Sequence, residues 1–226
     1  MKEIFDRRYP VTSFFLLVTA LVFLLMLVTA GGNFDRADTL FRFGAMYGPA
    51  IRLFPEQVWR LLSAIFVHIG WEHFIVNMLS LYYLGRQVEE IFGSKQFFFL
   101  YLLSGMMGNL FVFVFSPKSL AAGASTSLYG LFAAIIVLRY ATRNPYIQQL
   151  GQSYLTLFVV NIIIGSVLIP GISLAGHIGG AVGGAFLAVI FPVRGEKRMY
   201  NTSQRLGAVV LFVGLAILLF YKGMGM

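Results

Sequence analysis

The chain has 226 residues, of which 58% are hydrophobic and 12% are charged, so its composition predicts a membrane protein and not a soluble domain. The formal charge of +8 comes from basic residues that are dispersed along the chain, which argues against nucleic acid as a partner. The chain has no cysteine, which excludes disulfides, thiolate metal sites and a cysteine nucleophile.

Seven apolar runs are candidates for membrane helices, since a full span needs about 20 apolar residues. Helices are expected because backbone groups in lipid must be satisfied within the segment, and the alternating pattern of a membrane barrel is not visible. The sequence therefore predicts an all-α, polytopic membrane helix bundle. The runs are 12–31, 64–85, 96–116, 124–139, 152–170, 172–193 and 206–222.

The polar segments between these runs predict the orientation of the bundle. Residues 1–11 have mixed charges, and no small-residue cleavage site follows the first run, so we expect a short cytoplasmic N-terminus and a retained first helix. Residues 32–63 alternate aromatic and charged side chains and are expected to lie in the membrane interface. Most of the 17 Lys and Arg residues fall on the side of the N-terminus, which predicts that this side faces the cytoplasm.

Ionisable side chains within membrane spans are costly and mark functional sites. All three histidines, His68, His73 and His177, lie in or at the edge of apolar runs, whereas the acidic residues near the spans lie at their ends. An aspartyl protease needs two facing carboxylates, and no run contains an aspartate. A zinc protease usually has two histidines at positions i and i+4, which the spacing of His68 and His73 does not match. A hydroxyl nucleophile with a histidine base remains.

Ser125 and His177 are the candidate nucleophile and base. With a rise of about 1.5 Å per residue, Ser125 lies roughly 21 Å from the inner end of its run at Arg139, and His177 roughly 24 Å from the inner end of the sixth run. His73 lies roughly 20 Å from Arg86, so the three side chains are expected at one depth. The fourth run is too short to reach the outer surface, so the loop before it is expected to dip into the protein or line a water-filled cavity.

The combination of these residues resembles the motifs of rhomboid intramembrane proteases over nearly the whole chain. One position departs from the family pattern: the family usually has glycine directly after the serine, and this chain has Thr126. That departure puts the close backbone approach that glycine permits in question. The matching residues are Trp59 and Arg60 in the first loop, His68, His73 and Asn77 in the second run, Gly85, Glu89 and Gly93 after it, Gly123, Ser125 and Tyr129 around the serine, and His177 with Gly180 around the histidine.

The resemblance implies a six-helix catalytic core within residues 12–205 and an additional transmembrane helix within residues 206–226. It implies a serine endopeptidase that hydrolyses peptide bonds in or near transmembrane segments of other membrane proteins. The substrate helix would reach the site laterally, beside the second and fifth helices, and small or helix-breaking residues are expected where it is cut. We expect a multi-pass protein of the cell membrane whose active site opens to the outer side, with the lipid bilayer and membrane substrates as partners and with no metal or organic cofactor.

The resemblance also implies roles for single residues. Ser125 would be the nucleophile and His177 the general base, and a dyad is expected because no acid within a span is available to orient the imidazole. The oxyanion would be stabilised by His73, Asn77 and the backbone N–H of Ser125 at a helix N-terminus. Tyr129 would stack on His177.

Other residues have structural interpretations. Gly123 and Gly180 are expected to support the site, and Gly176, Gly180 and Gly184 recur every four residues as a stripe that would pack the sixth helix against the fourth. His68 is expected roughly 7.5 Å further out along its helix than His73, away from the pocket. Two alternatives stay open: a non-enzymatic binder of membrane segments, and a transporter that uses the three histidines. The sequence does not indicate the substrate or the oligomeric state.

The histidine spacing generates a first prediction. Because it lacks the pattern of a zinc protease, proteolytic activity should survive strong chelators. The measurement is cleavage of a membrane substrate before and after treatment with a chelator. Loss of activity that is restored by adding zinc would contradict the serine mechanism.

Overall fold

The computed structural model describes residues 6–168, 173–196 and 199–226, and in this part of the chain the regular structure is helical apart from two isolated β-bridges. The prediction of an all-α bundle is confirmed. The α-helices are α1 (Pro10–Ala30), α2 (Ala37–Arg42), α3 (Gly48–Leu53), α4 (Arg60–Ser63), α5 (Gly70–Ser80), α6 (Arg86–Phe92), α7 (Ser94–Phe115), α8 (Ser125–Ala141), α9 (Pro145–Leu168), α10 (Leu174–Ile190) and α11 (Thr202–Met224). Shorter helices are the 3-10 helices Gly31–Asn33, Pro55–Trp59 and Ala64–Phe66 and the π-helix Leu81–Gly85.

The described helices make the chain a multi-pass membrane protein. Four helical segments are long and apolar enough to cross a membrane: α1 with the turn that follows it, α7, the first 20 residues of α9, and α11. A fifth crossing results if Pro55–Phe66 and Gly70–Phe92, which are bent by 77°, form one span. The helices α8 and α10 are apolar but have 17 residues each. Length and composition thus support four or five full spans of the seven predicted runs.

The second predicted run was wrong at its start. A continuous helix begins only at Gly70, which has a φ of +75°, and the residues before it, Val67 and Ile69, are extended. The helical segment then continues through the π-helix to Phe92, beyond the predicted end at residue 85. The predicted boundary between the fifth and sixth runs and the first five residues of the predicted N-terminus lie outside the described residues.

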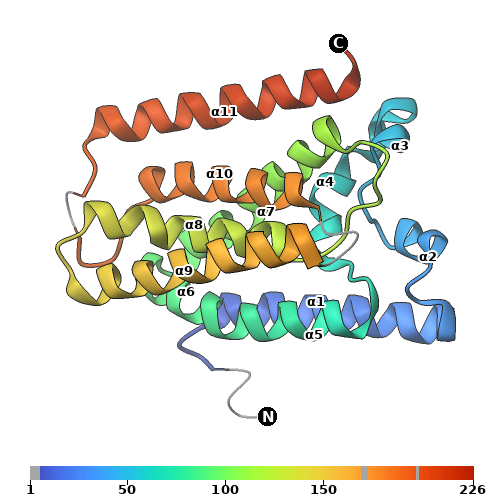
Figure 1. Cartoon of the computed structure of the whole chain (residues 1–226), viewed down its shortest axis with the longest axis horizontal. Coiled ribbons are helices and arrows are strands. Elements are labelled where there is room, and N and C mark those ends of the chain that lie inside the picture. Colours follow the sequence, from blue (N-terminus) through green and yellow to red (C-terminus); the bar gives the residue numbers. More distant parts are fainter. Residues whose placement is uncertain (1–5, 169–172, 197–198) are drawn as a thin grey trace.

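The centre of the bundle is formed by α7, α8 and α10, with α11 on one side and α1 and α5 on the other (Figure 1). A Cβ atom at Gly180 would overlap with the carbonyl oxygen of Thr126, and one at Gly184 would overlap with that of Gly130. A Cβ at Gly130 would in turn lie 3.0 Å from the carbonyl oxygen of Gly180. The backbones of α8 and α10 are therefore in contact, and the predicted packing of the glycine stripe is confirmed.

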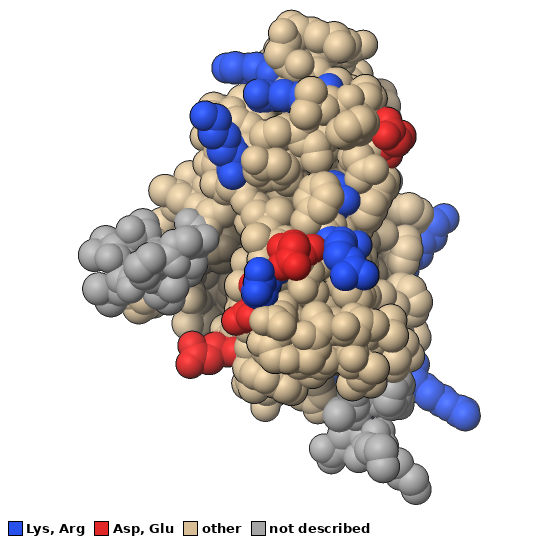
Figure 2. All heavy atoms as spheres, turned by 90° about the vertical axis from the view of Figure 1, so that its right-hand side faces the viewer, with Lys and Arg blue, Asp and Glu red and all other residues tan. Residues whose placement is uncertain are grey.

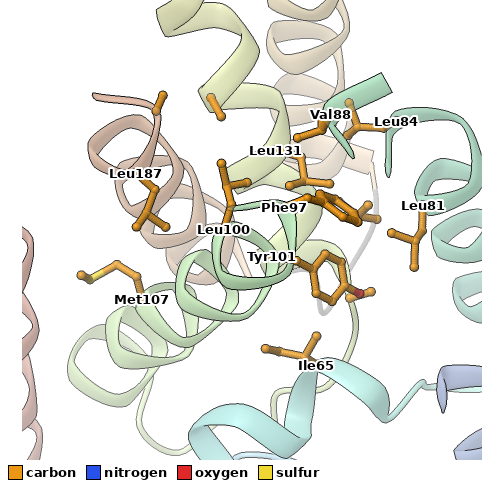
Figure 3. Close-up of a cluster of buried hydrophobic side chains, with 14 of the residues drawn as sticks. Ile65, Leu81, Leu84, Val88, Phe97, Leu100, Tyr101, Met107, Leu131 and Leu187 are labelled. Carbon is orange, nitrogen blue, oxygen red and sulfur yellow. The ribbon is translucent and has the colours of Figure 1, made fainter. Parts of the chain in front are cut away.

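Large apolar side chains fill the space on the other side of α8. Phe97, Leu100 and Tyr101 of α7 are fully buried, and Figure 3 shows them next to side chains of α6, α8 and α10. The ring of Phe15 in α1 stacks on Tyr101 with 4.2 Å between the centroids. Because lipid is as apolar as these side chains, this core stabilises the bundle mainly by close van der Waals packing.

The start of α1 is held by a buried carboxylate. Glu89 of α6 is 1% exposed, and its Oε1 accepts a hydrogen bond from the backbone N–H of Val11 at 3.0 Å. Its Oε2 accepts from the backbone N–H of Thr12 at 2.8 Å and from the hydroxyl of Thr12 at 2.7 Å. These N–H groups belong to the first turn of α1 and have no partner within the helix. Glu89 therefore caps α1 from a distant part of the sequence, with a charge that suits a helix N-terminus.

The first loop, residues 32–63, folds into short helices around a buried arginine. Arg60 is 4% exposed, and its Nη1 donates to the carbonyl oxygens of Phe41 at 2.5 Å and Ala45 at 3.1 Å. Its guanidinium lies over the rings of Phe41 and Trp59, at 3.8 Å and 4.6 Å from the centroids. Figure 2 looks onto the end of the bundle that carries α2 and α3 and shows charges of both signs scattered over a largely uncharged surface. That this loop lies in the membrane interface stays a prediction.

The capping of α1 generates a prediction on stability. Glu89→Ala should lower the free energy of unfolding by about 3 kcal/mol, because it leaves buried N–H and hydroxyl donors without an acceptor. The neighbouring Glu90 is the matched control, since its carboxylate accepts an exposed hydrogen bond from the Tyr9 hydroxyl at 3.2 Å. The measurement is unfolding of both variants in the same detergent. Equal stability of Glu89→Ala and Glu90→Ala would contradict the cap.

Candidate active site

Ser125 is the first residue of α8, and the loop before it fixes its position. Gly123 has a φ of +130°, and a Cβ there would lie 2.5 Å from Cε1 of His73, so both the conformation and the space require glycine. The backbone N–H of Gly123 donates to the carbonyl oxygen of Ala64 at 2.9 Å. The loop thus turns tightly against Ala64 and against His73 in the first turn of α5. It lies inside the protein, as the sequence predicted for the loop before the short fourth run.

His177 lies in the first turn of α10, where Ser173 caps the helix by accepting a hydrogen bond from the backbone N–H of Gly176 at 3.2 Å. Its Nε2 is 3.1 Å from Oγ of Ser125, within hydrogen-bond distance. The imidazole stacks on the ring of Tyr129, with centroids 3.9 Å apart and an angle of 9° between the planes. Among the described residues no carboxylate forms an ion pair with His177. The structure therefore brings together the predicted serine, histidine and tyrosine.

His73 and Asn77 of α5 border the other side of the serine. A Cβ at Gly123 would lie 2.8 Å from Nε2 of His73 and 3.6 Å from Nδ2 of Asn77, so both nitrogens face the turn before Ser125. Asn77 is 4% exposed, and its Nδ2 is a buried donor without a hydrogen-bond partner in the described structure. An unpartnered buried donor is costly and can be explained by a ligand atom that is bound there during function. These side chains border the turn at Gly123, two residues before Ser125.

His68 is not where the sequence predicted it. It precedes α5, is fully buried, and its ring lies 5.2 Å from that of His73, so the expected position further out along one helix was wrong. Its Nε2 accepts a hydrogen bond from the backbone N–H of Ala124 at 3.3 Å, and its Nδ1 lies 3.3 Å from the carbonyl oxygen of Phe66. These partners require the proton on Nδ1. His68 therefore holds the residue directly before Ser125, a role that helical spacing could not reveal because the chain is extended at Val67 and Ile69.

Thr126 is accommodated by a glycine on a neighbouring helix. A Cβ at Gly108 of α7 would lie 2.7 Å from the Cβ of Thr126, so the threonine side chain occupies space that Gly108 leaves open. Gly176 of α10 also faces the threonine, since a Cβ at Gly176 would lie 3.1 Å from Cγ2 of Thr126. The threonine side chain therefore points away from the serine side of α8, and the hydrogen bond between Ser125 and His177 is formed with Thr126 in place. The sequence did not identify Gly108 as its partner.

Comparisons with known proteins identify the family of the chain. The family model of the rhomboid domain matches residues 55–194, which is more than half of the chain. The rhomboid protease GluP of Bacillus subtilis (strain 168) is 32% identical, over 98% of this chain and 42% of its own length. RHOMBOID-like protein 2 of Arabidopsis thaliana is 30% identical, over 83% of this chain and 65% of its own length. The putative rhomboid protease YdcA of Bacillus subtilis (strain 168) is 26% identical, over 87% of this chain and 96% of its own length.

The chain thus spans less than half of GluP and less than two thirds of RHOMBOID-like protein 2. The family match covers α5, residues 116–124 before Ser125 (the serine loop), and α10, which carries His177. The geometry around Ser125 and His177 lies wholly within the matched region. On the family match and on these relatives, the chain belongs to the rhomboid family.

Proposed function

We propose that this protein is an intramembrane serine endopeptidase that hydrolyses peptide bonds in or near transmembrane segments of other membrane proteins. The observation that carries the proposal is the 3.1 Å contact between Oγ of Ser125 and Nε2 of His177, which joins the first turns of α8 and α10 inside a multi-pass bundle. A serine hydroxyl is a weak nucleophile until a neighbouring base accepts its proton. The family match and the names of the relatives support the same reaction class.

The reaction begins when Nε2 of His177 accepts the proton of the Ser125 hydroxyl and Oγ attacks the scissile carbonyl carbon. The tetrahedral intermediate carries its negative charge on the former carbonyl oxygen. The protonated imidazole donates its proton to the leaving amine, which gives an acyl-enzyme. A water molecule, deprotonated by His177, then hydrolyses the ester and restores Ser125. We assign a dyad, because the imidazole stacks on Tyr129 and no carboxylate of the described residues forms an ion pair with it.

In this proposal the oxyanion is stabilised by three donors, one at Ser125 and two that border the turn before it. The backbone N–H of Ser125 lies at the N-terminus of α8, where N–H groups have no intrahelical partner and the helix dipole favours negative charge. Nδ2 of Asn77 is buried without a partner, and His73 lies next to the turn at Gly123. Preorganised donors of this kind stabilise charge as it develops, because they need not reorient.

The substrate would be a transmembrane helix that unwinds near one end, since a peptide bond within an intact helix is shielded by its hydrogen bonds. Small or helix-breaking residues at the cut would lower the cost of unwinding. The outer faces of α5 and α9 expose large apolar side chains suited to lipid or to a substrate helix, among them Trp71, Val76, Leu79, Leu157 and Ile163. We propose that the substrate enters laterally beside these faces of α5 and α9.

We also propose that the six-helix core lies within residues 12–205 and the additional helix within residues 206–226. The site opens to the outer side of the cell membrane, with the N-terminus in the cytoplasm.

The nucleophile is tested by Ser125→Ala. Cleavage of a model membrane substrate should fall to background, because no other hydroxyl in the described structure forms a hydrogen bond with the His177 imidazole. Mass spectrometry after treatment with a fluorophosphonate should place the adduct on Ser125 in the unchanged protein and detect none in the variant. Thermal unfolding serves as the folding control. Cleavage by a folded Ser125→Ala protein at near the normal rate would overturn the assignment.

The oxyanion pocket is tested by His73→Ala, Asn77→Ala and the double variant. Removal of one such donor should lower kcat by about one to three orders of magnitude, with little change in KM. The double variant should be slower than either single variant but less slow than the product of the two effects, because both donors act on one charge. Single variants with normal kcat in a folded protein would exclude the pocket.

His68→Ala separates a positioning role from a donor role. Since His68 accepts from the backbone of Ala124, the variant should lose stability, and labelling of Ser125 by fluorophosphonate should slow together with kcat. This expectation differs from the sequence-based one, which placed His68 away from the pocket and therefore predicts mostly retained chemistry for the variant. Normal labelling by a stable His68→Ala protein would show that the serine loop does not depend on this hydrogen bond.

A further inference from the structure

The last turn of α11 is tied to the first loop by one arginine. Nε of Arg52 in α3 donates a hydrogen bond of 2.5 Å to the carbonyl oxygen of Gly223 near the end of α11, and Figure 1 shows this end beside α3. Carbonyl groups in the last turn have no intrahelical partner, and the negative end of the helix dipole favours a cation there. The guanidinium also lies 5.7 Å from the centroid of the Phe113 ring. Arg52 and Gly223 both lie outside residues 55–194, so this contact is not part of the family match.

Gly223 allows the end of α11 to reach Arg52. A Cβ at this position would lie 2.5 Å from Cε1 of Phe113 in α7, so a larger residue would push the helix end away from the bundle. Two other glycines of α11, Gly207 and Gly214, have nothing within 4 Å of a built Cβ. Among these three glycines, only Gly223, in the turn that contacts Arg52, is packed closely against another helix.

The segment that contains Arg52 is in turn bound to the serine loop. The backbone N–H of Gly48, the first residue of α3, donates to the carbonyl oxygen of Pro117 at 3.0 Å. Met46 and Ala121 exchange two backbone hydrogen bonds of 2.8 Å and 2.9 Å, and Met46 is fully buried. These three bonds join the first loop to residues 116–124, which lead directly into Ser125.

We propose that Arg52 is a positioning residue that uses the end of α11 to fix α3 and, through it, the loop that places Ser125. The inference rests on the proposed function, because it concerns the geometry of that nucleophile. With six residues, α3 is far too short to be stable alone, so its place depends on its contacts. The contact with Gly223 is a charged hydrogen bond to an otherwise unpaired carbonyl, which is the stronger kind. By this route α11 affects catalysis through the position of the loop that precedes Ser125.

The test compares Arg52→Gln, Gly223→Ala and the double variant with the unchanged chain. The control is Gly214→Ala, which adds the same methyl group to α11 where nothing lies within 4 Å. Residues that couple two sites have modest effects on the free energy between them. In each single variant, labelling of Ser125 by fluorophosphonate should therefore slow by about 2- to 30-fold. Cleavage should show the same loss in kcat with KM unchanged. The double variant should be no slower than the slower single variant, because both changes remove one contact.

Hydrogen exchange gives a readout that does not depend on catalysis. The backbone N–H groups of Ala121 and Gly123 should exchange faster in Arg52→Gln and Gly223→Ala than in Gly214→Ala, while thermal unfolding shows that all variants remain folded. Unchanged exchange and labelling, or additive effects in the double variant, would overturn the inference. If Arg52→Gln does not fold, Gly223→Ala decides alone by the same two readouts. Absence of labelling in the unchanged protein would refute the proposed function, and the exchange rates would still decide whether α11 fixes the loop.

Discussion

The site depends on how closely the backbones of α8 and α10 approach each other. Ser125 and His177 are 52 residues apart and belong to different helices, and their 3.1 Å contact depends on the close approach that Gly180 and Gly184 allow between the two backbones. Gly180 and Gly184 lie directly on carbonyl groups of α8, so one added methyl group at either position would force the helices apart. A hydrogen bond weakens steeply with such a displacement. Close helix packing, which membrane proteins use for stability, here also sets the distance between Ser125 and His177.

The same packing leaves a helix terminus inside the protein, and this has a chemical consequence. Because α8 has 17 residues, its first turn and the loop before it lie within the bundle, where water does not freely satisfy backbone groups. The loop donors are satisfied by Ala64 and His68, through the N–H groups of Gly123 and Ala124. The N–H groups of the first turn of α8 remain without intrahelical acceptors, which is the arrangement that an oxyanion needs. The short helix thus leaves backbone donors free at Ser125, as the proposed chemistry requires.

The sequence predicted local features of the site well and long-range features poorly. Apolar runs predicted the helices, and the four-residue glycine spacing predicted the packing of α10 on α8, because both follow from helical periodicity. The position of His68 was wrong because the chain is extended at residues 67 and 69, and a single Gly70 gives little warning of such a break. The role of Glu89 as a cap, 77 residues from Thr12, and the space that Gly108 leaves for Thr126 were not predicted. Such partners are brought together only by the tertiary fold, and no spacing rule encodes them.

The charges that organise this bundle act on backbone groups and not on opposite charges. Glu89 caps the first turn of α1, Arg60 binds two carbonyl groups of the first loop, and Arg52 binds the last turn of α11. By contrast, the two ion pairs within the described residues, Arg8–Asp6 and Arg36–Asp38, are between close neighbours in sequence and involve exposed arginines. Exposed pairs contribute little and are screened by salt, whereas a buried ion on a helix end is screened far less. Glu89 and Arg60 are buried, so their contacts with the first turn of α1 and with the first loop persist at high ionic strength. Arg52 is exposed, so its contact with the last turn of α11 is screened more strongly.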